Sequence, residues 1–216
     1  MHCVPALSLC AKLPNRVNGK LRQIPEFDPE RSDGDNPRPL PLIRWSRMSL
    51  VQIRRVIRAD AEELIAANVL SQHYHLPWVR SFVDQAGFDN WFSRGVTGAN
   101  VGLVAREVAS NKVVGVVNIN EIVAGVFQSA YLGYYGMVNF ARTGLMTEAI
   151  SATVAYAFSE LGLHRLEANI QPGNTASIAL VRRLGFRQEG FSPRYLRIDG
   201  EWRDHERWAL LADMLR

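Results

Sequence analysis

The stretch YLGYYGMVNFARTGLMTEA, residues 131–149, joins the pattern of a strand to that of a helix. Tyr131 to Val138 is rich in aromatic and apolar residues, as strands are. A glycine, Gly144, then precedes apolar residues at helical spacing, namely Met146, Ile150, Val154 and Phe158. We therefore expect a strand, a turn and a long helix that begins near Gly144.

The turn at Gly144 has features that suit a bound anion. Glycine lets the backbone approach a ligand closely, and the first N–H groups of a helix have no partner within it. The helix dipole is also positive there, and Arg142 and Thr143 add a charge and a hydroxyl. Many helices begin at polar residues and bind nothing, so this stretch alone leaves both interpretations open.

A second helix start follows in NTASIALVRRLGF, residues 174–186. Asn174 is the expected N-cap and Ser177 lies three residues further on. Arg182 and Arg183 occupy the last turn, where cations complement the dipole. Each feature alone is ordinary helix capping. Together with the preceding strand, turn and helix, they favour a ligand site.

The whole pattern predicts an α/β (α+β) layered domain with a mixed sheet. Strands are expected at 50–58, 101–107, 112–122, 129–138, 164–170, 186–196 and 201–211. Helices are expected at 60–72 and 75–95, after Gly144, and at 174–186.

Composition and charge narrow the class of protein. Of the 216 residues, 47% are hydrophobic and 21% charged, which suits one soluble domain. The net charge of +4 suits an anionic ligand but is too weak to indicate nucleic acid. No run of apolar residues is long enough to cross a membrane.

Residues 1–47 differ from the rest and hold seven of the ten prolines. We expect them to form a disordered extension before a domain at 48–216. No Lys or Arg precedes the first apolar run, which argues against a signal peptide. Cys3 and Cys10 are the only cysteines, so the expected compartment is reducing and cytoplasmic.

Three segments, taken in order, resemble the GNAT superfamily of acyltransferases. They are residues 131–149, residues 164–191 (HRLEANIQPGNTASIALVRRLGFRQEGF) and residues 195–210 (YLRIDGEWRDHERWAL). Within that superfamily the chain is most similar to the ribosomal-protein alanine N-acetyltransferases. The resemblance implies a splayed central sheet flanked by helices, with acetyl-CoA as co-substrate and no metal.

The turn at residues 141–146, which the resemblance implies binds phosphate, departs from the family's pattern. That pattern is Arg or Gln, any two residues, Gly, any one residue, and then Gly or Ala. Ala141 replaces the leading residue and Met146 the final small one, whereas Gly144 is kept. Backbone amides do most of the binding in such a turn. The resemblance therefore still implies a pyrophosphate on the amides of Arg142, Thr143, Gly144, Leu145, Met146 and Thr147.

The resemblance also implies roles along the rest of the co-substrate. The pantetheine arm would pair with the strand edge at 134–138, and Asn174 would bond it. Arg183, in preference to Arg182, would meet a phosphate. A backbone N–H near Met137 and Val138 would polarise the thioester carbonyl. Ser177 would hydrogen-bond the sulfur, with Tyr195 as the alternative acid.

The resemblance leaves open which group acts as the general base that accepts the proton of the amine. Related enzymes often carry a glutamate where this chain has Tyr131, and Glu121 is the nearest other carboxylate expected in the sheet. An α-amine has a reference pKa of about 7.7–8.0 against about 10.4 for lysine, so water could accept its proton. The missing glutamate thus fits an N-terminal substrate better than a lysine.

The acceptor side is less determined. Arg203 and Asp204 could line the acceptor groove, with Asp204 on the substrate ammonium, or could serve in turn stabilisation and cross-strand ion pairing. His73 and His75 have the spacing of a metal pair, but no further ligand completes a site, so a surface helix end is favoured.

The sequence leaves three functions open. The first is an acetyl-CoA-dependent N-acetyltransferase that acts on a protein N-terminus, with a ribosomal protein as partner. The second keeps the enzyme but uses a small amine as acceptor, and the third is a non-catalytic acyl-CoA-binding module. We expect no nucleic acid or membrane partner, and either a monomer or a homodimer.

Overall fold

The computed structural model describes residues 16–17, 20–21, 49–96 and 99–215. The chain divides into a unit that ends at Asn36 and a main unit that follows it. In the first unit, β1 (Arg16–Val17) pairs antiparallel with β2 (Lys20–Leu21). The expected disordered extension at 1–47 otherwise lies outside the described residues, as do both cysteines.

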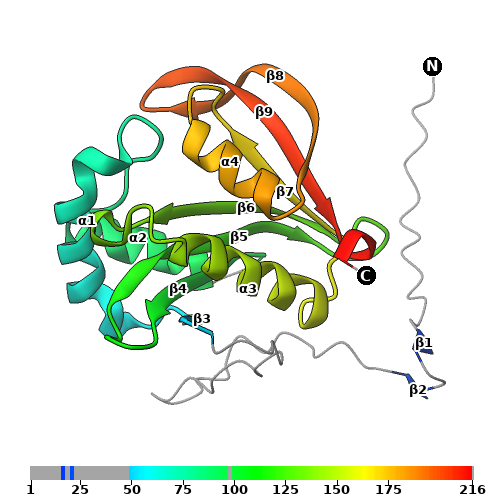
Figure 1. Cartoon of the computed structure of the whole chain (residues 1–216), viewed down its shortest axis with the longest axis horizontal. Helices are drawn as coiled ribbons and strands as arrows, with labels where there is room; N and C mark the ends of the chain where they lie inside the picture. Colours follow the sequence, from blue (N-terminus) through cyan, green and yellow to red (C-terminus); the bar gives the residue numbers. More distant parts are fainter. Residues whose placement is uncertain (1–15, 18–19, 22–48, 97–98, 216) are drawn as a thin grey trace, which may run out of the picture. The chain divides into compact units, whose positions relative to one another are not determined.

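The main unit is built on a seven-stranded sheet in the order β3-β4-β5-β6-β7-β9-β8 (Figure 1). Neighbouring strands are antiparallel except for β6 and β7, which are parallel, so the expected mixed sheet is confirmed. The strands are β3 (Val51–Arg55), β4 (Val101–Glu107), β5 (Val113–Val123), β6 (Ser129–Gly136), β7 (Arg165–Ile170), β8 (Arg187–Ile198) and β9 (Glu201–Leu211).

In the described residues of the main unit, four α-helices and three short 3-10 turns accompany the sheet. The helices are α1 (Ala61–His75), α2 (Gln85–Val96), α3 (Leu145–Ser159) and α4 (Thr175–Arg183), and the 3-10 turns are η1 (Arg58–Asp60), η2 (Val138–Phe140) and η3 (Ala212–Leu215). Among the described residues, no helix is both long and apolar enough to cross a membrane.

The prediction of a helix at 75–95 is wrong for residues 76–84. Helix α1 continues to His75, and no helix forms again until Gln85. Pro77 lacks an N–H and disfavours a helical residue before it, and Leu76 is accordingly extended, with φ −71° and ψ 146°. The side chain of Asp84 accepts a hydrogen bond from the Gly87 N–H and so marks the start of α2.

The two faces of the sheet carry different helices. On β5, Val116 packs in a cluster with Phe88 of α2, whereas the next residue, Val117, packs in a cluster with Ile150 of α3. Side chains that follow one another on a strand point to opposite faces, so α1 and α2 cover one face and α3 and α4 the other.

The sheet opens between β6 and β7. They pair only at Ser129–Tyr131 with Arg165–Glu167, after which β6 continues along β5 and β7 along β9. Figure 1 shows the two strands starting side by side and separating, with α4 beside the opening. The expected splay is therefore present, and the second half of β6 has an open edge.

Candidate active site

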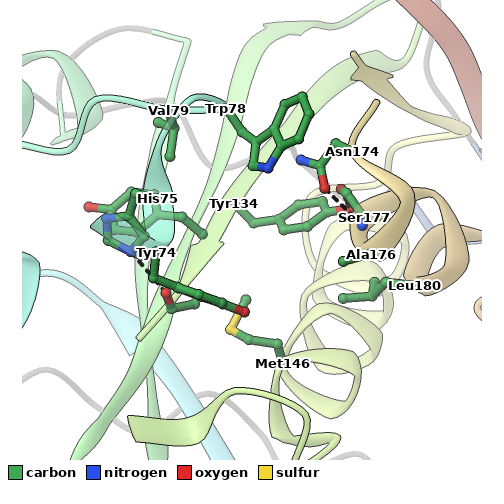
Figure 2. A pocket seen from close by; sticks show the side chains of 12 residues that line it. Tyr74, His75, Trp78, Val79, Tyr134, Met146, Asn174, Ala176, Ser177 and Leu180 are labelled. Carbon is green, nitrogen blue, oxygen red and sulfur yellow. Dashed lines mark hydrogen bonds between the residues drawn. The ribbon is translucent and has the colours of Figure 1, made fainter. Parts of the chain in front are cut away.

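A pocket of about 180 Å³ lies at the opening between β6 and β7 (Figure 2). Strand β6 lines it with residues 134–136, and α4 lines it with Ser177. Met146 of α3 lies at another side, and His75 and Trp78 come from the end of α1 and the loop after it. Residues far apart in the sequence thus meet around one cavity.

Ser177 and Tyr134 form a hydroxyl pair inside this pocket. Their oxygens are 2.5 Å apart, and Figure 2 shows the phenol pointing at Ser177. Burial raises the pKa of Tyr134 to about 12, although the hydrogen bond with Ser177 acts to lower it. The phenol therefore keeps its proton at neutral pH and can help to supply one.

Tyr134 is absent from the residues that the sequence predicts for the site. The alternation of the strand would have found it, because Leu132 on the same face of β6 packs against α3 and α4. Tyr195, the acid expected from the resemblance, does not line the pocket. Its hydroxyl instead hydrogen-bonds Tyr131, which raises the pKa of that phenol, and its ring packs edge-on against His205.

Asn174 caps α4 as the sequence predicts. Its side-chain oxygen accepts a hydrogen bond of 3.1 Å from the Ser177 N–H. This bond fixes the first turn of α4, and with it the place of Ser177 in the pocket. Asn174 lines the pocket too, and its bond to a pantetheine arm stays a prediction.

A glycine in the left-handed region precedes α3. Gly144 is the N-cap residue, with φ 86°, a region that favours glycine. Arg142 also has a positive φ, of 61°, and is exposed. A Cβ added at Gly144 would meet no atom within 4 Å, so backbone conformation and not crowding selects glycine here.

The amides of this turn are not all free, which corrects one expectation. Thr143 N–H bonds the Phe140 carbonyl, and Leu145 N–H lies 3.4 Å from the Thr143 hydroxyl. Thr147 N–H bonds the Gly144 carbonyl. Within the described part of the chain, the amides without a partner are those of Arg142, Gly144 and Met146.

The large residue at Met146 is accommodated by two glycines in the sheet beneath it. A Cβ at Gly136 would lie 2.8 Å from the Met146 side chain, and one at Gly115 would overlap its sulfur. Gly115 and Gly136 face each other on β5 and β6. The two glycines therefore leave room for the Met146 side chain. The turn accommodates a methionine at the position where the family usually has Gly or Ala.

The structure separates the two arginines at the end of α4. Arg183 Nη1 lies 3.5 Å from the hydroxyl of Thr147, in the first turn of α3. The Arg182 guanidinium instead lies over the ring of Trp208, 5.0 Å from its centroid. Of the two, Arg183 is the one beside the turn at Gly144.

Arg183→Ala is therefore expected to weaken coenzyme A binding about fivefold at low salt, since an exposed charge contributes about 1 kcal/mol. The loss should shrink in high salt, because screening already weakens such a contact. Arg182→Ala is the matched control and should leave the affinity unchanged. Calorimetric titration at two salt concentrations measures both, and equal losses in the two variants would contradict the assignment.

The end of β6 is held by α1. Met137 N–H bonds the Val114 carbonyl of β5 at 2.8 Å, and Val138 N–H bonds the Ser71 hydroxyl at 3.1 Å. The Met137 amide thus points to β5 and not to the open edge, and the expectation that a backbone N–H near Met137 and Val138 polarises the thioester carbonyl stays a prediction. The Val138 amide already has a partner from α1.

His75 is buried, contrary to the expected surface helix end, whereas His73 is exposed. Its Nε2 lies 2.9 Å from the Gly136 carbonyl and its Nδ1 2.9 Å from the Ser81 hydroxyl. Burial lowers the pKa of His75, although the bond to Gly136 acts to raise it. No group of three or more His, Cys, Asp or Glu in the described ranges could hold a metal ion.

Two buried histidines should make stability depend on pH. Burial lowers the pKa of both His75 and His205 below the unfolded value of about 6.5, so below that pH the unfolded chain binds more protons. Their contribution is complete above pH 6.5 and is lost as pH falls through the folded pKa values. Urea unfolding should show a falling free energy of unfolding from pH 6.5 to 5.

The control for this prediction is the double variant His75→Gln with His205→Gln. It removes both titrating groups, so its stability should change less over the same pH range. A wild-type protein that becomes more stable toward pH 5 would contradict the prediction.

Three further predicted residues lie outside the pocket. Glu121 is exposed at an irregularity of β5, where its N–H donates to the Asn100 side chain. Arg203 pairs with Glu201 at 2.6 Å, and the Asp204 carboxylate accepts the Arg194 N–H at 2.7 Å. These contacts favour ion pairing and strand stabilisation for Arg203 and Asp204.

The loop after α1 forms the remaining wall. The Trp78 ring packs so closely on Gly173 that a Cβ there would lie 2.9 Å from it. Arg80 of the same loop pairs with Asp199 in the β8–β9 turn at 2.6 Å. The loop thus joins the end of α1 to both the β7–α4 connection and the last hairpin.

Comparisons with known proteins agree with this geometry. Residues 51–187 match the family model described as Acetyltransferase (GNAT) domain. The chain is 34% identical to the [Ribosomal protein uS5]-alanine N-acetyltransferase of Escherichia coli over 79% of this chain and 92% of that protein. It is 37% identical to the probable N-acetyltransferase YjcK of Bacillus subtilis over 48% of this chain and 57% of that protein.

A solved structure shares the fold. Mycobacterium smegmatis RimJ in complex with CoA-disulfide superposes with a TM-score of 0.70 at 29% identity, covering 76% of this chain and 83% of that one.

Proposed function

Because this chain belongs to the GNAT acetyltransferase family, we propose that it transfers the acetyl group of acetyl-CoA to the α-amine of a protein N-terminus. The acceptor we propose is an N-terminal alanine of a ribosomal protein. The proposed acceptor rests on one observation. This chain is 34% identical, over 92% of that protein, to an enzyme named for acetylating such an alanine. The pocket geometry supports the acetyl transfer itself.

The residues of the opening fit acetyl-CoA. The free amides of Arg142, Gly144 and Met146, at the positive end of α3, suit the pyrophosphate. Arg183 stands beside this turn and adds a charge. The open edge of β6 leads from the turn to the hydroxyl pair, which would place the thioester beside Ser177 and Tyr134.

The reaction we propose is direct attack of the amine on the thioester. A bond forms between the amine nitrogen and the carbonyl carbon, and the carbon–sulfur bond breaks with its electron pair on sulfur. The Ser177–Tyr134 pair gives the thiolate its proton and recovers one from solvent. A pocket proton acceptor is not required, because an α-amine is partly neutral near pH 7 and releases its proton to water.

The lining of the pocket fits this scheme. The side chains that line it include no aspartate or glutamate. Glu121→Gln should accordingly leave most of the activity, since Glu121 is exposed and lies outside the lining.

The deciding experiment is an acetyl-transfer assay on an array of peptides. Peptides that begin with Ala and a free α-amine are compared with the same peptides blocked at the N-terminus but carrying an internal lysine. Spermidine is included as a small amine. We expect mass spectrometry to find acetylation on the free N-termini, with the Ala peptides leading.

The other outcomes separate the competing functions. Transfer only to lysine side chains, or only to spermidine, would replace the proposed acceptor. Tight binding of acetyl-CoA without transfer to any acceptor would indicate a non-catalytic acyl-CoA-binding module.

A further inference from the structure

Strand β7 presents polar side chains on the face that points away from α4. Every second residue of β7 packs in the cluster with α3 and α4, namely Leu166, Ala168 and Ile170. Side chains that follow one another on a strand point to opposite faces. Arg165, Glu167 and Asn169 therefore lie on the other face of the sheet.

Asn169 has a buried side-chain oxygen without a hydrogen-bond partner. Three buried side-chain atoms of the described residues lack one, namely Asn68 Oδ1, Arg106 Nε and Asn169 Oδ1. Of these residues, only Asn169 is on one of the two strands that border the opening, β6 and β7. An unpaired buried acceptor destabilises the free protein, so this oxygen indicates a ligand that brings a donor.

The pairing of β6 with β7 places Asn169 at the opening. The last pair is Tyr131 with Glu167, and the next residues that face the same way are Gly133 and Asn169. Gly133 has no side chain, and a Cβ there would meet only the Asn120 side chain, at 3.4 Å. The β6 side of the opening thus leaves room for a ligand at the level of Asn169.

The hydroxyl pair of the pocket lies on the opposite face at nearly the same level. Tyr134 follows Gly133 on β6 and points to Ser177 on α4 (Figure 2). The thioester of the proposed complex would lie beside this pair. An amine that reaches the thioester carbon through the opening from the other face would pass Asn169, while the sulfur stays beside the hydroxyls.

Neighbouring polar groups on the face of Asn169 already have partners. The Glu167 carboxylate accepts a hydrogen bond of 2.8 Å from Arg165 Nε. The hydroxyls of Tyr131 and Tyr195 bond each other. Among these groups, the Asn169 oxygen is the acceptor that remains free.

We infer that Asn169 binds the acceptor, its side-chain oxygen accepting an N–H of the attacking amine and so directing the nitrogen lone pair at the thioester carbon. This rests on the proposed acetyl transfer in the pocket, whichever amine is the acceptor. A neutral amine has N–H donors as well as a lone pair, so a hydrogen bond to Asn169 leaves the lone pair free. Holding the nucleophile in this direction reduces the entropy lost on reaching the transition state.

The test replaces Asn169 with two residues of similar size. Asn169→Leu removes the oxygen, whereas Asn169→Asp keeps an oxygen in the same place and is the matched control. Calorimetric titration of an Ala-starting peptide onto the protein saturated with coenzyme A measures acceptor binding. Steady-state assays give kcat and KM for both substrates, and thermal unfolding gives Tm.

We expect Asn169→Leu to weaken peptide binding and to lower kcat/KM for the peptide, each about 30-fold. The affinity for coenzyme A should stay unchanged, because Asn169 does not line the pocket of the hydroxyl pair. Asn169→Asp should bind the peptide at least as tightly as wild type, since its carboxylate attracts the ammonium form. The Tm of Asn169→Leu should be about 2–4 °C higher, because an unpaired buried oxygen is removed.

Three results would overturn the inference. They are a wild-type peptide affinity in Asn169→Leu, an Asp variant that binds the peptide as weakly as the Leu variant, and a lower Tm in Asn169→Leu, which would indicate a structural role. A wild-type protein that acetylates only lysine or spermidine would refute the proposed acceptor alone, and the variants are then compared on that amine. A wild-type protein that acetylates no amine would overturn both.

Discussion

Tyr134→Phe and Ser177→Ala are each expected to lower kcat about 100-fold, with coenzyme A affinity nearly unchanged. The two hydroxyls lie 2.5 Å apart in the pocket, and burial keeps the phenol protonated. The thiolate that leaves in the reaction needs a proton, and a positioned acid typically contributes about 10²–10⁴-fold. Stopped-flow or steady-state assays with saturating acetyl-CoA measure the change.

Two tyrosines serve as controls. Tyr135 is the next residue of β6, but its side chain points to the α1 face, where its hydroxyl lies 3.5 Å from Asn68. Tyr195 bonds Tyr131 and lies outside the pocket. Tyr135 lines the pocket too, but neither its hydroxyl nor that of Tyr195 pairs with Ser177. Tyr135→Phe and Tyr195→Phe should therefore each keep kcat within about threefold of wild type.

The double variant tests whether the two hydroxyls act together. If one passes its proton through the other, then Tyr134→Phe combined with Ser177→Ala should be about as slow as either single variant. Full activity in both single variants, or a large loss in Tyr195→Phe alone, would show that another group protonates the sulfur.

Gly144→Val is expected to raise the dissociation constant for coenzyme A about 100-fold. A β-branched residue resists the φ of 86° that Gly144 adopts, so the turn must rebuild and the free amides change direction. Charge-assisted hydrogen bonds contribute about 1.5–3 kcal/mol each, so the loss of one or two accounts for this factor. Calorimetric titration of the purified protein measures it.

The matched control is Gly125→Val. Gly125 also has a positive φ, of 72°, and a Cβ there would likewise meet no atom within 4 Å. Both variants carry a similar strain of about 1–3 kcal/mol, but only Gly144 lies in the turn before α3. Acetyl-pantetheine, which lacks the pyrophosphate, should bind wild type and Gly144→Val alike. A parallel loss for acetyl-pantetheine would show that the turn does not act through the phosphates.

Most elements of the fold follow from short-range patterns. The strand, turn and helix around Gly144 and the capped helix after Asn174 lie where the sequence predicts them. The region 76–84 does not, because Pro77 follows the end of α1 and interrupts the helix expected at 75–95. The site was predicted in part: Ser177 and Asn174 line the pocket, whereas Tyr195 and Glu121 do not.

The missed residues share a cause. Tyr134 and Tyr195 are both tyrosines on strands, and only the packing of α4 against β6 and β7 determines which one meets Ser177. His75 and Gly136 are 61 residues apart, and no local pattern links them. Met146 is compatible with the turn only because glycines occupy two strands beneath it.

The sequence by itself determined the order of the elements, the glycine turn before α3 and the cap of α4. These depend on backbone preferences and hydrogen bonds between residues a few positions apart. Tertiary structure alone decided which amides remain free, which tyrosine faces Ser177 and which histidine is buried. Those outcomes depend on how strands pair and on which helix covers which edge, and such contacts join residues from distant parts of the chain.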